Sequence, residues 1–514
     1  MSAQPARRSR GRRQKSSSKP VLNQLPRKRL VNPYSPIEPL SVDQIESIHQ
    51  ASLKLLRDTG INFSLPEAID RLKKAGAIVE KGSERVRFDP DMIEEFIGLA
   101  PSEVTMYARN PENNMQIGGK NVLFDSVSST PNCSDIDNGR RPGNIKDFRK
   151  FLKLTQHFNI ISAVGGYPVE PIDWHPSIRH LEASRDIIQY TDKPMRGYAT
   201  DKVRLLDALE MARISRGISH SQLETEPSLM TTINVNSPLV LDGRMLEGII
   251  EMAKRNQLTI LTPFTLAGAM APITLAAALA QQNAEALAAY VMSQVVRPGA
   301  PVMYGGFTSN VDMKSGSPAF GTPEYMKTAM VGGQLARRYG LPYRSSNVCA
   351  ANSVDAQAAY ESVFSLWGAV MGGANLLKHA AGWLEGGLCA SFEKFVLDVD
   401  LLQMVSEFMK PIKISDSELA LDVIDEVGPG GHFFGTKHTQ ERYRDAFYAP
   451  LISDWRNFES WEEAGSPQAY QKANQVFKQA LNEYQQPPLD EAIKDELDDF
   501  VERRIAEGGV KTDF

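Results

Sequence analysis

The chain has 514 residues, of which 42% are hydrophobic and 23% are charged, and its formal net charge is −5. These values are ordinary for a globular protein and are enough for a large core, in one large domain with additions or in two to three smaller domains. Three well-separated cysteines, Cys133, Cys349 and Cys389, exclude a disulfide scaffold and fit a reducing cytoplasm. No pair of them has the spacing of a zinc site, and no pattern predicts any other metal site.

The N-terminal segment differs sharply in charge from the rest of the chain. Residues 1–37 contain ten Lys or Arg and no acid, which leaves about −15 on the remainder. The stretch Arg7–Arg13 has almost no apolar residues and cannot fold alone. We expect a disordered basic tail over residues 1–37. A nucleic-acid contact, which rests on this tail alone, an acidic partner and an organellar transit peptide are the alternatives. No apolar stretch follows its charges, so no secretory signal is expected.

A small α/β unit is expected next, over residues 38–120. Ser41 and Gln44 form a capping-box pattern at the start of one helix, and a second helix is expected from Ser64 to Gly76. Short β-like runs follow, so this segment reads as an N-terminal α/β cap.

Residues 121–410 repeat one pattern eight times, a short β-type run followed by a longer helical one. Successive starts lie roughly 30–45 residues apart, the length of one strand, one helix and two loops. Eight parallel strands with crossover helices predict an α/β protein with a (β/α)8 TIM barrel, whose chemistry lies at the C-terminal strand ends. The predicted strands begin at Asn121, Ile160, Pro194, Leu229, Leu258, Pro301, Pro342 and Asn375.

Two further segments complete the prediction. Residues 256–284 carry no charge, but Pro263 and Pro272 interrupt them, so they predict a buried strand, loop and helix and no membrane span. Residues 411–514 predict a mostly helical C-terminal extension. It contains a glycine-rich loop with His432, either a structural turn against the barrel mouth or part of a substrate- or partner-docking surface.

The residues at or just past the strand ends are expected to line the barrel mouth. They are aromatic and amide-rich with few positive charges, the nearest base being Lys378, which fits a phosphosugar poorly and a small cation well. Glu385 would add charge complementarity. The predicted substrate-binding residues are Tyr167, Tyr198, Asn234, Asn236, Phe264, Tyr304, Phe307, Asn347, His379, Trp383 and Glu385, with Asp125, Ser126 and Ser346 nearby.

Each of these residues also has a purely structural interpretation. An aromatic residue in a barrel strand is usually core, and the apolar stretch around His379 slightly favours a structural role over a catalytic one. Asn234 and Asn236 share one strand parity, so both are able to face inward. Cys349 has no partnering motif, which favours a buried core residue over a nucleophile.

Four stretches, in order, resemble the trimethylamine:corrinoid methyltransferase family. They are GAMAPITLAAALAQQNAE at 268–285, DAQA at 355–358, AAGWLEGGL at 380–388, and GPGGHF at 428–433 followed by His438 and Thr439. The resemblance covers residues 40–465 or thereabouts. It implies a TIM-barrel methyltransferase that moves a methyl group from a methylated amine to the Co(I) of a corrinoid, which a separate partner protein carries.

One departure from the family pattern concerns the substrate. The archaeal trimethylamine enzymes carry pyrrolysine shortly before the segment that resembles 355–358, whereas residues 347–352 here are all standard. Relatives without it include enzymes for quaternary amines, so the resemblance implies glycine betaine. Transfer from trimethylamine, proline betaine or carnitine, or a non-catalytic small-cation binding protein, are the alternatives.

The chemistry of a quaternary amine agrees with this choice. Its demethylation expels a neutral amine and needs no acid, and Co(I) is the nucleophile, so neither a catalytic triad nor a zinc motif is required. Alignment of the methyl group is enough, because well-placed reactants gain about 7–11 kcal/mol. A betaine carboxylate would take donors from Asn234, Asn236, Asn347 and His379. No catalytic residue is assigned. We further expect a cytoplasmic homo-oligomer without tightly bound cofactor and without membrane contact.

Overall fold

The computed structural model describes residues 21–512, so residues 1–20 of the predicted basic tail lie outside the described range. The part of that tail that is described, residues 21–37, runs along the barrel. Strand β1 (Leu30–Val31) pairs antiparallel with β7 (Asn121–Ser126), and the Tyr34 hydroxyl donates to the Phe408 carbonyl at 3.0 Å. A boundary at residue 37 therefore assigns too much of the chain to a free tail.

Parallel strands form the centre of the molecule, as the sequence predicts. The main sheet joins neighbouring parallel strands in the order β7, β19, β18, β15, β13, β11 and β10. The strands are β10 (Met195–Arg196), β11 (Leu229–Ile233), β13 (Leu258–Leu261), β15 (Val302–Gly305), β18 (Tyr343–Ser346) and β19 (Leu376–Ala381).

The extended segment 160–164 closes this sheet into a barrel. The Ser162 amide donates to the Phe124 carbonyl at 2.7 Å, and the Ser126 amide donates to the Ala163 carbonyl at 3.2 Å, both toward β7. On its other side the Val164 amide donates to the Pro194 carbonyl, just before β10, at 3.1 Å. Seven of the eight predicted barrel strands are therefore present as strands, and the one predicted from Ile160 is an irregular segment that pairs with β7 through the single bridge Asp125–Ala163.

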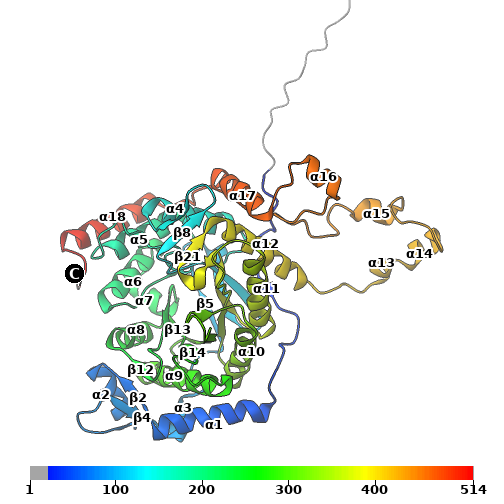
Figure 1. Ribbon diagram of the computed structural model, residues 1–514. Coiled ribbons are helices and arrows are strands. Elements are labelled where there is room, and N and C mark those ends of the chain that lie inside the picture. Colours follow the sequence, from blue (N-terminus) through cyan, green and yellow to red (C-terminus); the bar gives the residue numbers. More distant parts are fainter. Residues whose placement is uncertain (1–20, 513–514) are drawn as a thin grey trace, which may run out of the picture.

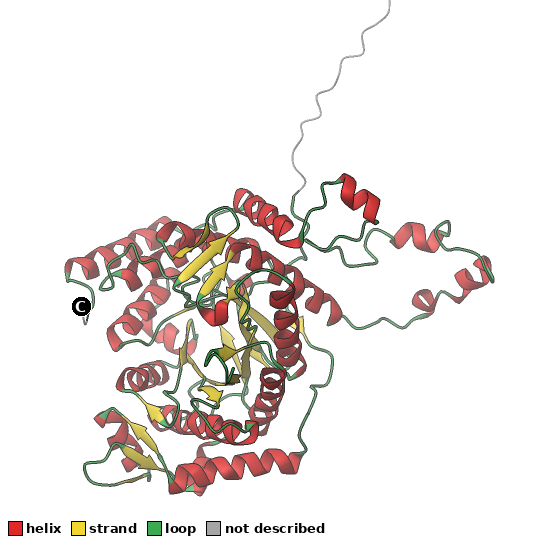
Figure 2. Ribbon diagram, viewed as in Figure 1, coloured by secondary structure: helices red, strands yellow, loops and turns green. Residues whose placement is uncertain are grey.

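Helices surround the strands, one after each, as Figures 1 and 2 show. Their apolar faces pack on the sheet because each crossover must bury one face of its helix. These helices are α4 (Ile145–His157), α5 (Arg179–Tyr190), α6 (Lys202–Arg216), α8 (Gly243–Lys254), α9 (Leu275–Val296), α10 (Pro323–Arg338), α11 (Ala356–Met371) and α12 (Phe392–Phe408), with α7 (His220–Thr225) inserted before β11.

The N-terminal cap packs against α9 on the outside of the barrel, and one hairpin of the cap closes the end at which the barrel strands begin. Its hairpin β5–β6 brings Met106 and Ile117 into one apolar cluster with Met230, Ile260 and Met303 of the barrel strands. The interior below the strand ends is therefore filled. The cap comprises α1 (Val42–Asp58), β2 (Ile61–Phe63), α2 (Pro66–Lys74), β3 (Ile78–Val79), β4 (Arg85–Arg87), α3 (Pro90–Phe96), β5 (Glu103–Met106), η1 (Pro111–Asn113) and β6 (Met115–Gly118).

Short strands extend the barrel beyond its upper rim. One small sheet has the order β20, β21, β8 and β9, another has the order β14, β16 and β17, and β12 joins β2 of the cap. They are β8 (Asn132–Asp135), β9 (Gly139–Pro142), β12 (Val240–Leu241), β14 (Phe264–Ala267), β16 (Phe307–Val311), β17 (Pro318–Ala319), β20 (Trp383–Leu384) and β21 (Cys389–Ser391), with η2 (Glu385–Gly387) after β20.

The C-terminal extension is mostly helical and has two parts. Helices α17 (Ala469–Glu483) and α18 (Glu491–Ala506) pack on the barrel helices, and Arg504 binds Asp207 of α6 at 2.9 Å. Before them, a segment with α13 (Asp416–Leu419), α14 (Leu421–Val427) and α15 (Lys437–Arg442) projects from the body, and α16 (Phe458–Glu463) follows (Figure 1). Within residues 21–512 no helix has the length and apolarity to cross a bilayer.

A buried ion pair joins α12 to the turn after β19. The Lys394 ammonium contacts both oxygens of Asp398 at 2.5 and 2.7 Å and the Ser362 hydroxyl at 2.7 Å. The second Asp398 oxygen also accepts from the Gly382 amide at 2.8 Å. Both side chains are fully buried, so each charge depends on the other.

We expect Lys394→Met to lower the free energy of unfolding by about 3–5 kcal/mol, because it leaves the Asp398 carboxylate buried without a cation. The double variant Lys394→Met/Asp398→Leu should lose less than the single variant, since no unpaired charge remains. Urea unfolding of the three proteins measures both differences. A single variant within about 1 kcal/mol of wild type would show that the pair does not hold α12 to the turn after β19.

Candidate functional site

A cavity of about 460 Å³ opens at the C-terminal ends of the barrel strands. This is the size of a small-molecule site and the end of the barrel where such sites lie. It is lined by Ser128, Ser129, Arg196, Thr232, Asn234, Val235, Asn236, Asp242, Met245, Thr262, Phe264, Met270, Phe307, Arg344, Lys378, His379, Trp383, Gly386 and Gly387.

Strand alternation explains how these side chains reach the cavity. Residues two apart on a strand face the same side, so the inward Met230 and Ile260 of the apolar floor are followed by Thr232 and Thr262 one layer higher. Leu376 of the floor is likewise followed by Lys378. The barrel interior is thus apolar at its base and polar directly beneath the cavity.

This polar layer is strongly cationic. Arg196 from β10, Arg344 from β18 and Lys378 from β19 all line the cavity, and their residues are 9%, 3% and 1% exposed. Asp125 of β7 lies behind them and binds the Lys378 ammonium at 2.8 Å, while the carboxylate residue in the lining itself, Asp242, caps α8. The prediction that the mouth holds few positive charges is therefore wrong.

The two guanidinium groups have few acceptors from the protein. Arg196 donates to the Gly165 carbonyl at 3.2 Å, and Arg344 donates to the Gly306 carbonyl at 3.5 Å. The Nε atoms of both are buried and have no hydrogen-bond partner in the described structure. Buried donors without acceptors are costly, so two that line a cavity indicate an anionic ligand group.

Burial lowers the pKa values of the basic groups in this layer. The pKa of Lys378 falls to about 7, because burial and the nearby Arg196 and Arg344 outweigh the ion pair with Asp125. Burial lowers the pKa of Arg344 to about 10. The pKa of His379 is held well below its usual value by burial and then by the charges of Arg344, Lys378 and Arg196, so its imidazole is neutral at physiological pH.

Aromatic rings form another part of the cavity lining. Phe264 and Phe307 lie 5.2 Å apart between ring centroids, and Phe307 lies 6.4 Å from Trp383. The Arg344 guanidinium sits 5.1 Å from the centroid of the Phe307 ring. The cavity therefore presents cations and ring faces to the same bound molecule.

An irregularity in β19 brings two consecutive residues to the cavity. The register of β19 against β7 shifts between Leu377 and Ala381, and His379 has a φ of 54°, in the left-handed region that non-glycine residues avoid. The His379 ring consequently stacks on Trp383 at 5.2 Å, and its Nδ1 lies 3.4 Å from the Ser128 hydroxyl. Such backbone strain is commonly found at functional sites.

A buried carboxylate holds the loop that carries the two asparagines. Glu285 of α9 accepts from the Ser237 hydroxyl at 2.6 Å and from the Leu239 amide at 2.9 Å. Burial raises the pKa of Glu285. Because Asn234 and Asn236 directly precede these contacts and line the cavity, Glu285 fixes their position from outside.

The structure separates the predicted site residues into three groups. Asn234, Asn236, Phe264, Phe307, His379 and Trp383 line the cavity. Two tyrosines lie behind it: the Arg196 guanidinium is 5.1 Å from the Tyr198 ring centroid, and the Tyr198 hydroxyl accepts from the Tyr167 amide at 2.8 Å.

Three predicted residues point away from the cavity. The Tyr304 hydroxyl donates to Asn283 of α9 at 2.9 Å, because Tyr304 has the opposite parity to the inward Met303. Asn347 donates to the Ala380 carbonyl and accepts from Ser365, each within 3.1 Å. Glu385 binds Arg140 at 3.0 Å, so its charge is already paired.

Sequence reasoning missed the two arginines although a signal for them exists. A step of two residues back from the predicted Tyr198 leads to Arg196, and the same step from Ser346 leads to Arg344. A charged residue inside a barrel strand has to face the axis, because the other face packs on helices.

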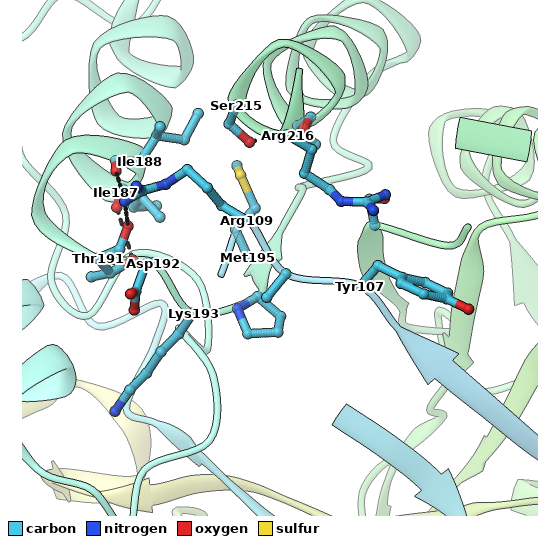
Figure 3. Close-up of a pocket in the computed structure, with 14 residues that line it drawn as sticks. Tyr107, Arg109, Ile187, Ile188, Thr191, Asp192, Lys193, Met195, Ser215 and Arg216 are labelled. Carbon is cyan, nitrogen blue, oxygen red and sulfur yellow. Dashed lines mark hydrogen bonds between the residues drawn. The ribbon is translucent and has the colours of Figure 1, made fainter. Parts of the chain in front are cut away.

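A second pocket lies at the opposite ends of the strands, beside the start of β10 (Figure 3). The Arg109 side chain fills it and donates to the carbonyls of Ile188 and Thr191 at 3.2 and 2.9 Å. The remaining volume is about 20 Å³, which is room for one water. This pocket is part of the scaffold.

The chain matches the model of the family described as trimethylamine methyltransferase over residues 6–509. It is 36% identical to a glycine betaine methyltransferase of Desulfitobacterium hafniense strain Y51, across 91% of this chain and 98% of the relative. It is 29% identical to a trimethylamine methyltransferase of D. hafniense strain DSM 10664 / DCB-2, across 91% and 94%.

A solved structure of a hydroxylamine complex of the methyltransferase MtmB has the same overall fold. It superposes with a TM-score of 0.51 at 12% identity, covering 90% of this chain and 88% of that one. At this identity the likeness concerns the fold alone.

Proposed function

We propose that this chain, which belongs to the trimethylamine methyltransferase family, transfers a methyl group from a zwitterionic quaternary amine, glycine betaine in particular, to a corrinoid. The observation that carries the substrate choice is the pairing of Arg196, Arg344 and Lys378 with an aromatic wall in one cavity. A betaine has one group for each half of this lining. Its carboxylate meets the unpaired guanidinium donors, and its trimethylammonium group meets the ring faces.

The ammonium end and the carboxylate end of the substrate contribute unequal binding energies. Ring faces hold a quaternary ammonium group with about 0.5–2 kcal/mol each, and this group donates no hydrogen bond. A buried, charge-assisted contact to the carboxylate is stronger, and loss of one such contact costs about 2–5 kcal/mol. Arg196 and Arg344 therefore replace the amides predicted from the sequence as the main carboxylate donors, while Asn234 and Asn236 supply further donors at the rim.

The chain's own residues act by binding and orientation. Fixing the carboxylate on the cationic layer directs the ammonium end of the substrate toward the aromatic rim, where a methyl group is presented outward. The leaving amine is neutral, so no acid has to protonate it, and the neutral His379 agrees with this requirement. Such orientation lowers the activation free energy by up to about 7–11 kcal/mol.

The methyl acceptor has to meet the substrate at the open rim. A corrin ring is far larger than the cavity of about 460 Å³, so it fits above the cavity and not inside it. A corrinoid in its Co(I) state, carried by a separate protein, supplies the nucleophile. Buried, unpaired cysteines at 133, 349 and 389 support a reducing compartment such as the cytoplasm.

The alternatives differ in how much of the cavity they use. Trimethylamine has no carboxylate and would leave both guanidinium groups without a partner, which disfavours it. Proline betaine and carnitine carry both groups and share the proposed binding mode. A non-catalytic binding protein would show the same affinities without turnover.

The reaction itself provides the first test. Incubation of the purified chain with glycine betaine and a reduced corrinoid should produce methylcobalamin absorbance together with one equivalent of dimethylglycine. Binding of glycine betaine by calorimetry without either product would contradict the methyltransferase and leave a binding protein.

The second test separates the two halves of the substrate. Arg344→Met should weaken glycine betaine binding by at least about 30-fold, the lower end of the cost of a lost buried charge contact. Choline, which keeps the quaternary nitrogen but has no carboxylate, should lose no affinity, because the substitution removes only repulsion between its positive charge and Arg344. The control Arg149→Met removes an arginine that binds Asp186 outside the cavity. Equal losses for both ligands would contradict carboxylate recognition by Arg344.

The third test uses the titration of Lys378. The pKa of its ammonium is about 7 in the free protein, and a bound carboxylate raises that pKa, so binding above this pH takes up a proton. Affinity should thus be highest below pH 7 and fall by up to about 10-fold by about pH 8.5. Calorimetry in buffers of different ionisation enthalpy measures the uptake. Lys378→Met should bind more weakly and without this pH dependence; an unchanged slope in that variant would assign the titration to another group.

A further inference from the structure

A segment of the C-terminal extension, residues 411–447, leaves the body and returns to it. It begins after α12 and ends where Tyr448 bonds to Asp400 of the same helix. We call residues 411–447 the arm; Figure 1 shows it projecting from the barrel with α13, α14 and α15. None of these three helices has a buried residue.

The arm exposes an unusual amount of apolar surface. Phe434, Phe447 and Ile412 are 81%, 85% and 87% exposed. Its other exposed large apolar residues are Ile414, Leu419, Leu421, Ile424, Phe433 and Tyr443. Since an aromatic side chain buries about 150–250 Å², these residues together offer on the order of 1,000 Å². Large exposed apolar surfaces mark sites of protein association.

The arm's helices are too short to be stable alone. They contain 4, 7 and 6 residues, whereas an isolated helix below about 12–15 residues is marginal in water. Their stability has to come from packing, and the body of the same chain does not provide it. Another surface must cover the arm.

The barrel carries a matching apolar surface beside the root of the arm. On α11, Tyr360, Val363, Phe364 and Trp367 follow the i, i+3, i+4, i+7 spacing of one helix face, which is normally polar on the outside of a barrel. The Trp367 ring lies 4.7 Å from Phe408 of α12 and joins the two helices. We call this surface, with Met404 of α12, the α11–α12 patch.

The α11–α12 patch is large for an exposed apolar surface. Tyr360 is 61% exposed, and Val363, Phe364, Met404 and Phe408 are each between 39% and 47% exposed. This amounts to about 500 Å², near the upper end for the largest apolar patch of a typical monomer. The arm begins three residues after Phe408, so both surfaces lie around one point of the fold.

We propose that a second copy of this chain covers both surfaces, the arm of each protomer lying on the α11–α12 patch of the other. Because the two surfaces lie close to one another on the chain, reciprocal exchange in a two-fold dimer covers both of them at once. The arm alone offers more than the roughly 800 Å² per partner of a standard stable interface.

The apolarity of the arm and of the α11–α12 patch favours a permanent partner such as a second copy of the chain. Interfaces that form and separate are about as polar as the rest of a protein surface, whereas homodimer interfaces are more apolar. A methyl-accepting protein has to dissociate in each cycle, so a surface of this apolarity suits it poorly. The glycine-rich loop with His432 lies within the arm and belongs to this docking surface.

Sedimentation velocity of the full chain tests the proposal. Wild type should be a dimer at micromolar concentration. An arm variant, Phe434→Ser/Phe447→Ser, and a patch variant, Tyr360→Ser/Phe364→Ser, should each raise the dimer dissociation constant at least 10-fold, as an order of magnitude. The control Val42→Ser/Ile172→Ser changes apolar residues that are 81% and 52% exposed elsewhere and should remain dimeric. A monomeric wild type, or dimers in both variants, overturns the proposal.

A mixing experiment distinguishes exchange of arms from contact between two arms. A pair formed from one arm variant and one patch variant retains one intact contact, the arm of the patch variant on the patch of the arm variant. Energy transfer between differently labelled variants should therefore show mixed dimers tighter than either variant forms alone. No gain on mixing rejects the exchange. Circular dichroism and glycine betaine affinity should match wild type in every variant, which separates this outcome from a failure of the proposed function.

Discussion

Three buried cations share one carboxylate inside this barrel. This excess of positive charge constrains which ligand the cavity above it binds. Removing a charge from water costs several kcal/mol even after relaxation, and the one direct ion pair of Asp125 among these three cations is with Lys378. Arg196 and Arg344 keep their charge, since a guanidinium is not deprotonated near neutral pH. In the proposed function the substrate carboxylate completes the cationic layer. Without it, burial and the charges of Arg196 and Arg344 lower the pKa of Lys378 to about 7.

The rest of the lining decides which anion is suitable. A phosphate would prefer the free N-terminus of a helix, but Asp242 already occupies that end of α8, where its carboxylate accepts from the Met245 amide at 2.9 Å. Phe264, Phe307 and Trp383 then offer ring faces where a simple anion would need donors. A zwitterion with a carboxylate at one end and a methylated cation at the other satisfies both parts of the lining.

The sequence predicts the barrel well because its evidence is local. Each strand and helix is marked by hydrophobic period and by caps such as Ser41 and Asn144, and the handedness of crossovers leaves little freedom for their arrangement. Side-chain direction is harder. Tyr304 and Asn347 sit in the predicted strands but at the outward parity, and His379 faces the cavity only because its left-handed backbone shifts the register. The arm and its patch depend on surfaces that meet across chains, which no local pattern reveals.

The cationic layer also favours the proposed reaction over mere binding. Glycine betaine enters with no net charge, and loss of a methyl group leaves a neutral amine and the carboxylate, a net charge of −1. Positive charge on the substrate therefore disappears as the bond to the methyl group breaks, and its repulsion with Arg196, Arg344 and Lys378 disappears with it. Only interactions stronger in the transition state accelerate a reaction, and in a water-poor cavity this change of charge is such an interaction. The same attraction retains the anionic product until its amine takes up a proton and restores a zwitterion, so the layer that promotes transfer also ties product release to proton uptake.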